Sequence, residues 1–299
     1  MKPLTLIQQY VWIADTIYRA RRITFSELNE RWKATEMSGG QPMVRMTFYR
    51  YKEDLQRLFG IIIDCDASDD YRYYIVNREE MRESSTQRWM LDTLRVNGLI
   101  SESLSLHDRI QLETMSYDED MLRLAIEAMK QNHRVVISYK CYDSHEIKQH
   151  HVEPYCIKLY RHRWYLLGHY ESGNFAMFSL DRIRDIKITE DKFELDKKFD
   201  TEAFFQDYFG VIISNKEEIQ RIVLRAYGWE RKSMLHLPMH CSQRELQHGD
   251  GYIDYEITAH TTNDLTGYIL SRGQWLVVKY PQWYADEIKQ GHMEAVAKY

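Results

Sequence analysis

Two apolar stripes at helical spacing, with a capped segment between them and two β-rich runs after them, fill residues 1–78 and constrain the fold of this chain most strongly. In both stripes the apolar side chains recur three and four positions apart, which is typical of one buried helix face. Gly60 ends the second stripe, and a polar turn separates the two β-rich runs, which predicts a β-hairpin. The predicted elements are a helix over 4–21, a helix capped by Thr24 or Ser26 and ending near Lys33, a helix over 46–59, and strands over 61–65 and 71–76.

Three helices followed by a hairpin are the layout of a winged helix-turn-helix, whose third helix enters the major groove of DNA. Residues 1–60 have a net charge of +4, which suits a polyanionic partner. The inner stripe of the third helix is predicted to be Phe48, Tyr51, Leu55, Leu58 and Phe59. The predicted DNA-binding residues are Arg45, Thr47, Tyr49, Arg50, Lys52 and Arg57 around that helix, and Arg72 on the hairpin.

These cations are expected to have different roles on DNA. Arg50 is the best candidate for a contact with a base or a phosphate, because a guanidinium suits both guanine edges and phosphate oxygens. Arg45, Lys52 and Arg57 are expected to contact the DNA backbone, and Arg72 could supply a contact from the hairpin. The alternative for each cation is a solvated helix position without any DNA contact.

Residues 79–131 form a predicted helical linker. Residues 77–131 have a net charge of −4, contain little glycine or proline, and carry apolar side chains at helical spacing. Because short DNA-reading modules usually bind spaced half-sites in pairs, we expect the linker to make a homodimer contact. A simple spacer is the alternative.

After Asn132 the pattern changes from the period of helices to that of strands. Residues 132–190 contain five short β-rich runs with polar or glycine-containing breaks, which predicts a small barrel. The predicted strands span 134–142, 151–159, 163–170, 174–180 and 183–188. In the third run, alternation assigns Trp164 and Leu166 to the core, while Arg163 and Tyr165 project from the opposite face.

The stretch Trp164-Tyr165-Leu166 resembles the motif of the WYL domain, and its surroundings strengthen that resemblance. HHVEPYCIKLYRHRWYLLG contains the motif and MFSLDRI follows it. TFYRYKEDL near the N-terminus, and PMHCSQRE, TNDL and ILSRGQWLVV further on, are similar to WYL-domain transcriptional regulators. The resemblance covers nearly the whole chain and implies a winged helix-turn-helix, an Sm-like or SH3-like barrel that senses a ligand, and a C-terminal extension.

The resemblance also implies which residues would bind the ligand, which is often a nucleotide or nucleic acid. Residues at matching positions are Tyr139, Tyr165 and Arg182, with Lys158 and Arg163 as additions. Many members carry an arginine where Ser179 stands, and its loss weakens the case for a highly charged ligand. Cations beside tyrosines can pair with phosphates while the rings stack on bases. Alternatively, Arg182 pairs with Asp181 or Asp185 and the tyrosines only pack.

Residues 191–299 are predicted to form a small α+β extension. Residues 190–299 have a net charge of −5, which argues against direct DNA binding and favours ligand gating or dimer contacts. The predicted elements are helices over 199–211, 263–270 and 283–299, and strands over 219–227, 252–259 and 275–280.

No motif for catalysis or metal binding stands out. His150 and His151 are adjacent on a predicted strand and therefore point to opposite faces, and neither they nor His162 and His169 have a recognised ligand spacing. The sequence contains no P-loop, G-x-G-x-x-G or G-x-S-x-G motif. We therefore predict a non-enzymatic protein without catalytic residues, metal or cofactor.

The sequence therefore predicts a multidomain α+β protein that acts as a homodimeric, ligand-responsive transcriptional regulator. Its expected partners are a double-stranded DNA operator and a nucleotide or oligonucleotide effector. No apolar run reaches the roughly 18 residues of a membrane helix, so we expect a cytoplasmic protein without membrane contact. Three alternatives remain: an accessory nucleic-acid-binding protein of a defence or DNA-damage system without promoter control, a metal-dependent nuclease, and a protein-binding scaffold.

Overall fold

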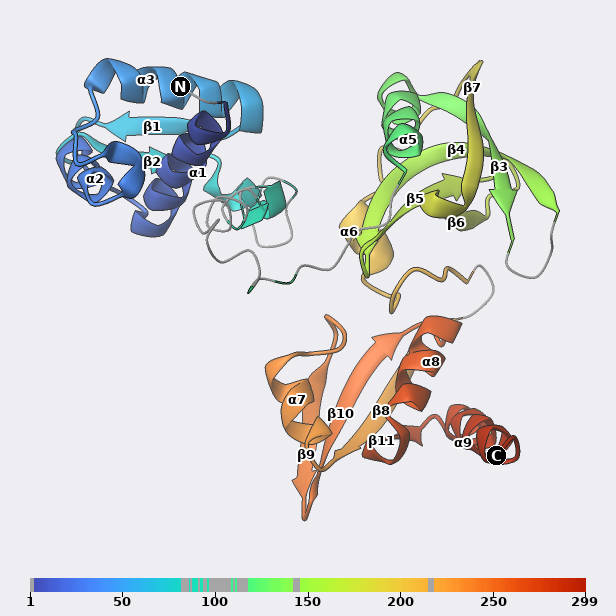
Figure 1. Cartoon of the computed structure of the whole chain (residues 1–299). Helices are drawn as coiled ribbons and strands as arrows, with labels where there is room; N and C mark the ends of the chain where they lie inside the picture. Colours follow the sequence, from blue (N-terminus) through green and yellow to red (C-terminus); the bar gives the residue numbers. More distant parts are fainter. Residues whose placement is uncertain are drawn as a thin grey trace. The chain divides into compact units, whose positions relative to one another are not determined.

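The computed structural model describes residues 3–81, 118–141, 146–214 and 218–299, together with 86, 88–90, 92, 93, 96, 109 and 111. The chain divides into two compact units, residues 1–113 and 114–299 (Figure 1). No helix within the described residues is long and apolar enough to cross a membrane.

The first unit contains three helices and a hairpin in the predicted order (Figure 1). Its elements are α1 (Pro3–Ala20), α2 (Phe25–Lys33), α3 (Arg45–Phe59), β1 (Ile63–Asp66), β2 (Arg72–Ile75) and the 3₁₀ turns η1 (Glu36–Ser38) and η2 (Arg78–Met81). Of the two predicted caps, Thr24 caps α2, because its side chain accepts from Glu27 N while the Glu27 carboxylate accepts from Thr24 N. Gly60 ends α3 with a left-handed φ of 65°.

One hydrophobic core joins the three helices to the hairpin. Phe48, Tyr51 and Leu55 of α3 are buried in it, as predicted, but Leu58 is 53% exposed. The prediction that Leu58 faces inward is wrong, because this residue lies at the edge of the buried stripe in the last helical turn. A backbone bridge between Ile23 and Tyr73 ties the α1–α2 connection to the hairpin and so holds β2 in place.

The second unit begins with helix α5 and a five-stranded antiparallel sheet in the order β6-β5-β4-β3-β7. The elements are α5 (Glu119–Gln131), β3 (His133–Lys140), β4 (Ile147–Tyr160), β5 (Arg163–His169), β6 (Phe175–Ser179), the 3₁₀ turn η4 (Leu180–Arg182) and β7 (Ile183–Lys192). All five predicted strands are present, but the predicted closed barrel is not. Among the described residues, β6 and β7 remain separate edges, because η4 carries the chain from β6 to the far edge, where β7 pairs with β3.

Helix α5 belongs to the core of this sheet. Ala125 and Ala128 are fully buried, and α5 packs against β3, β4 and β7. The end of the linker predicted over residues 79–131 is therefore part of the sheet's packing. Most of the linker, and with it any dimer contact there, lies outside the described residues.

The opposite face of β4, β5 and β6 is also covered. Lys158, Tyr165 and Ser179 lie opposite one another in register on that face. Their neighbours Cys156 and Leu167 are buried. The covering segment runs over residues 193–211 and includes α6 (Thr201–Phe205), which lies beside this sheet (Figure 1). The prediction of an outward face on β5 is therefore wrong for the middle of the strand, whereas Arg163 at its start is exposed. The predicted helix over 199–211 is limited to α6.

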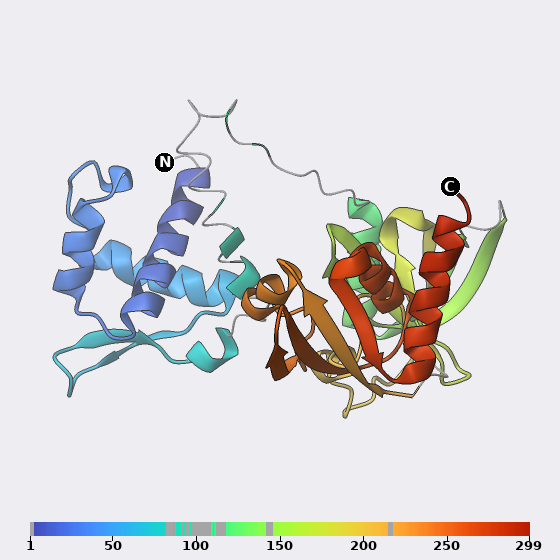
Figure 2. The same cartoon turned by 90° about the horizontal axis from the view of Figure 1, so that it is seen from below.

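The C-terminal part forms a four-stranded antiparallel sheet in the order β11-β8-β10-β9. Its elements are β8 (Gln220–Tyr227), α7 (Glu230–His236), β9 (Arg244–Gly249), β10 (Tyr252–Ala259), α8 (Asn263–Ser271), the 3₁₀ turn η5 (Gly273–Trp275), β11 (Leu276–Tyr280) and α9 (Gln282–Val296). Strands β8, β10 and β11 and helices α8 and α9 agree with the predictions, whereas α7 and β9 were not predicted. The order up to β11 is a split βαβ arrangement, and α9 packs beside α8 (Figure 2).

Candidate functional site

The exposed side of α3 brings together several predicted DNA-binding residues. Arg45, Tyr49 and Lys52 line a groove of about 550 Å³ between α2, α3 and the hairpin. The Tyr49 hydroxyl lies 3.4 Å from the Tyr73 hydroxyl, which holds the Tyr49 ring toward the hairpin. The other residues lining the groove are Thr24, Phe25, Ser26, Cys65, Asp70, Tyr71 and Tyr73.

The arginines of α3 differ in their partners. The Arg45 guanidinium lies 5.0 Å from the centre of the Phe25 ring, and Arg50 lies 5.4 Å from that of Tyr51. Within the described part of the chain, neither arginine forms an ion pair with a carboxylate. By contrast, Arg57 Nη2 lies 2.6 Å from Asp54 Oδ1. Arg45 and Arg50 are therefore better placed than Arg57 to bind an external anion, while Thr47 is half-buried.

Carboxylates surround Arg72, the hairpin residue that was predicted to contact DNA. Asp66 and Asp69 each lie 2.9 Å from Arg22 Nη1. Hydrogen bonds from Ser68 and Arg22 lower the pKa of Asp66 to about 2, so this carboxylate stays charged. Arg72 lies 3.5 Å from a Glu27 oxygen and 3.7 Å from Asp69. A phosphate would have to compete with both carboxylates for Arg72.

Among the groove-lining residues that were not predicted to bind DNA, three have hydroxyl groups suited to an anion: Thr24, Ser26 and Tyr71. Thr24 and Ser26 stand at the start of α2, where backbone N–H groups are available to anions. Tyr71 is 67% exposed at the hairpin turn. The T-x-x-E capping box marks the helix start in the sequence, so it could have pointed to the first two; no comparable signal identified Tyr71.

Two of the predicted ligand residues form one contact group at β3 and η4. Tyr139 is 8% exposed, and its hydroxyl accepts a hydrogen bond from Ser179 N at 3.3 Å. The Arg182 guanidinium lies 4.8 Å from the centre of the Tyr139 ring. Arg182 also donates from Nε and Nη2 to the Lys140 carbonyl, at 3.1 and 2.8 Å. These bonds place the Arg182 guanidinium at the C-terminal end of β3.

Arg163 and Tyr165 of β5 adjoin that group through Ser179 and Asp181. Tyr165 lies opposite Ser179 in register. Arg163 Nη2 lies 3.5 Å from Asp181 Oδ2, and Asp181 also accepts a hydrogen bond from the Ser179 hydroxyl. A carboxylate of the chain therefore already binds Arg163, and an incoming phosphate would have to displace Asp181.

Lys158 is held by the covering segment. Its ammonium donates to the Gly210 carbonyl at 2.8 Å and lies 3.8 Å from the centre of the Phe205 ring. Asp264 of α8 accepts from Val211 N and Ile212 N at 2.8 Å each, which fixes the backbone beside that carbonyl. Lys158 therefore joins the first sheet of this unit to the segment that leads into the second sheet, in place of the open ligand contact predicted for it.

Replacing Lys158 with methionine should change how stability depends on pH. Burial lowers the pKa of Lys158 from 10.5 to about 8. Between these values the unfolded chain binds more protons than the folded chain, so raising the pH favours folding. The free energy of unfolding of the wild type should thus rise relative to that of Lys158→Met across this window. Urea unfolding at several pH values measures the difference; a constant difference would contradict this role.

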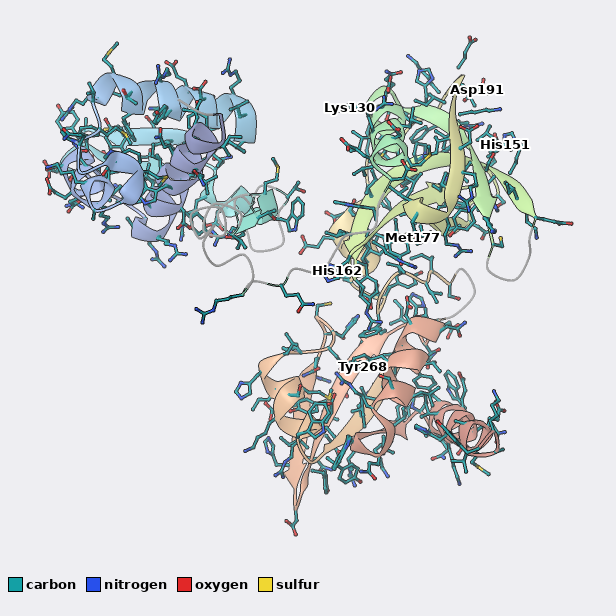
Figure 3. The ribbon with its side chains drawn as sticks, in the orientation of Figure 1. Lys130, His151, His162, Met177, Asp191 and Tyr268 are labelled. Atoms are coloured by element: carbon teal, nitrogen blue, oxygen red, sulfur yellow. The ribbon has the colours of Figure 1, made fainter. Side chains whose placement is uncertain are left out.

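His150 lies beside Tyr139 in an aromatic environment. Its Nδ1 lies 2.6 Å from the Tyr170 hydroxyl, and its ring centre is 5.1 Å from that of Phe178. Burial lowers the pKa of His150, which favours the neutral ring. His151 and His162 lie far apart (Figure 3). Among the described residues, no group of three or more His, Cys, Asp or Glu side chains could hold a metal ion.

Comparison with known proteins identifies the class of one part of the chain. Residues 120–188 match the WYL domain, so a WYL domain is found over α5 and the five-stranded sheet. The search of curated proteins gives no match.

Two solved structures show low overall similarity. Proteasome accessory factor B/C (PafBC) of Arthrobacter aurescens is 14% identical, with a TM-score of 0.35; the match covers 94% of this chain and 45% of that one. The chain thus spans less than half the length of PafBC. A CRISPR Cas-related protein is 12% identical, with a TM-score of 0.40 and coverage of 99% and 85%. At these scores neither similarity supports a functional conclusion.

Proposed function

We propose that the chain is a DNA-binding transcriptional regulator whose first unit is a winged helix-turn-helix. The observation that carries the proposal is the exposed cationic side of α3. Arg45 and Arg50 have no carboxylate partner within the described residues, and Lys52 lines the groove together with Arg45. A helix with such a side fits the major groove, where arginines contact guanine and phosphate.

The test is selection of binding sites by the full chain from a random library of duplex DNA. We expect enrichment of a short sequence, present as two spaced half-sites if the protein acts as a homodimer. Retention of all duplexes without sequence preference would contradict the regulator and favour the accessory nucleic-acid-binding protein. Footprinting upstream of its own gene then distinguishes promoter control from other uses of a selected site.

We further propose that the group around Tyr139 and Arg182 binds a phosphate-bearing effector. The support is the half-buried guanidinium of Arg182, which is stacked on the Tyr139 ring. Such a set can bind a phosphate and stack on a base. To regulate DNA binding, the effector must bind one conformation of the protein more tightly than another.

Mass spectrometry of small molecules and oligonucleotides that co-purify with the protein tests this second step. We expect wild type to retain a nucleotide or oligonucleotide that Arg182→Ala loses, because the variant lacks the stacked guanidinium. Arg184→Ala is the matched control, since Arg184 is an exposed arginine two residues further along. Equal recovery from wild type and Arg182→Ala would rule out this assignment.

A further inference from the structure

The four-stranded sheet of the C-terminal part has one covered face and one open face. The covered face carries Ile222, Leu224 and Ala226 of β8, which share a core with side chains of α7, α8 and α9. Because side chains alternate along a strand, the intervening residues of β8 lie on the other face. The open face of the two central strands is formed by Arg221, Val223, Arg225 and Tyr227 of β8 and by Tyr252, Asp254, Glu256 and Thr258 of β10.

Strand β11 adds exposed side chains to this open face. Tyr280 lies opposite Val223 and Val277 lies opposite Arg225, so both belong to the same face. Tyr280 is 49% exposed and the Arg221 side chain is 54% exposed. These exposures show that solvent reaches this face.

The surface of the open face is cationic although the C-terminal part as a whole is acidic. Its charged residues are the cations Arg221, Arg225, Arg244 and Lys279 and the carboxylates Asp254 and Glu256. Arg225 binds Asp254 at 2.7 and 2.9 Å, and both Arg221 and Arg244 bind Glu256. Each carboxylate side chain is only 5% exposed, so the guanidinium groups form the outer layer.

Tyrosine rings accompany these cations. The ring centres of Tyr227 and Tyr252 are 6.2 Å apart, and the Arg225 guanidinium lies 3.7 Å from the centre of the Tyr252 ring. The Arg221 guanidinium lies 5.4 Å from that of Tyr280. Four-stranded sheets with helices on one face and aromatic and cationic side chains on the other can bind single-stranded nucleic acid, because rings stack on bases of any sequence.

We propose that this open face binds a single strand of nucleic acid. The tyrosines stack on bases, and the exposed guanidinium groups and Lys279 pair with phosphates. A second copy of the chain suits the face less well, because two surfaces with excess cations repel each other. The site shares no residue with α3 or with the group around Tyr139, so it goes beyond the proposed function and can be tested independently of it.

The test is fluorescence anisotropy of the full chain with labelled oligothymidine and oligouridine of about 12 nucleotides, a length within the range that small modules cover. We expect Tyr280→Ala to raise the Kd by about 5-fold or more, the lower end of the effect of losing one stacked base. Arg221→Ala should weaken binding and reduce its dependence on salt. Tyr280→Phe keeps the ring and should bind like the wild type.

Matched controls separate this face from other surfaces. Trp283→Ala removes an aromatic residue of similar exposure, 50%, from α9, and Lys232→Ala removes an exposed cation from α7; neither should change the Kd. Failure of the wild type to bind at low salt overturns the proposal, as does a Kd that both Tyr280→Ala and Arg221→Ala leave unchanged. A change of oligomeric mass in Arg221→Glu, without oligonucleotide binding by the wild type, would assign the face to self-association instead.

Discussion

Replacing Arg50 with alanine is expected to weaken binding to the selected duplex by about 1–3 kcal/mol and to relax base preference at one position. The reason is that Arg50 is exposed on α3 and, among the described residues, forms no ion pair with a carboxylate that would compete with guanine. Anisotropy titrations with the selected duplex, and with duplexes changed at each position, measure both effects. An equal loss on all duplexes would make Arg50 a backbone contact.

Two further variants test whether the effect on duplex binding is particular to Arg50. Arg57→Ala should cause a smaller loss of binding affinity, because Arg57 is already paired with Asp54. As the loss of a phosphate contact, it should be equal for all sequences and should lower the slope of log Kd against log salt concentration by about one. Arg19→Ala should leave binding unchanged, since Arg19 is an exposed arginine paired with Asp15 on α1. A comparable loss in Arg19→Ala would move the duplex contact away from α3.

The first unit could be predicted closely because its pattern is local. Apolar periodicity gave the first and third helices, and the cap at Thr24 or Ser26 and Gly60 marked two helix ends. The partners of the cations could not be predicted, because they come from distant parts of the chain. Arg72 illustrates this, since Glu27 lies on α2 and is remote from the hairpin in sequence.

The five-stranded sheet shows where local alternation fails. The sequence pattern located its strands but could not show whether they close into a barrel. Closure depends on which edge strand β7 joins after η4, and β7 joins β3 at the edge far from β6. Alternation also assigned Tyr165 to an outward face, whereas residues 193–211 cover that face. A covering segment remote in sequence leaves no periodic signal in the strand that it buries. Burial of both Leu166 and Leu167 is the result.

In the C-terminal part, β9 and α7 were not predicted because both lack a clear apolar periodicity. Strand β9 is an edge strand with almost every residue exposed, so it has no apolar alternation. Helix α7 has only seven residues, too few for a clear helical stripe. The open face was missed for a different reason: the net charge of the segment concealed a local excess of cations that appears only when β8, β9 and β10 are aligned.

Removing either member of the Glu230–Arg272 pair alone should destabilise the C-terminal part by about 3–5 kcal/mol. Glu230 is fully buried, and Arg272 Nε lies 3.2 Å from its Oε1. Within the described residues, neither carboxylate oxygen has a hydrogen bond of good geometry, so the nearby guanidinium is its main compensation. Arg272→Met would therefore leave a buried carboxylate without a counter-charge. Urea unfolding followed by tryptophan fluorescence measures the loss, since Trp229 lies next to Arg272.

The double variant Glu230→Gln/Arg272→Met separates this electrostatic cause from simple loss of packing. Replacing both charges of a buried pair by neutral groups of similar volume is often close to neutral, because the desolvation cost of the carboxylate disappears together with the attraction. We therefore expect the double variant to be more stable than Arg272→Met alone, with a coupling energy between the two sites measured by the double-mutant cycle. If the two losses simply add, the guanidinium acts through its stacking on Tyr268 and its 2.8 Å hydrogen bond to that hydroxyl, and not through Glu230.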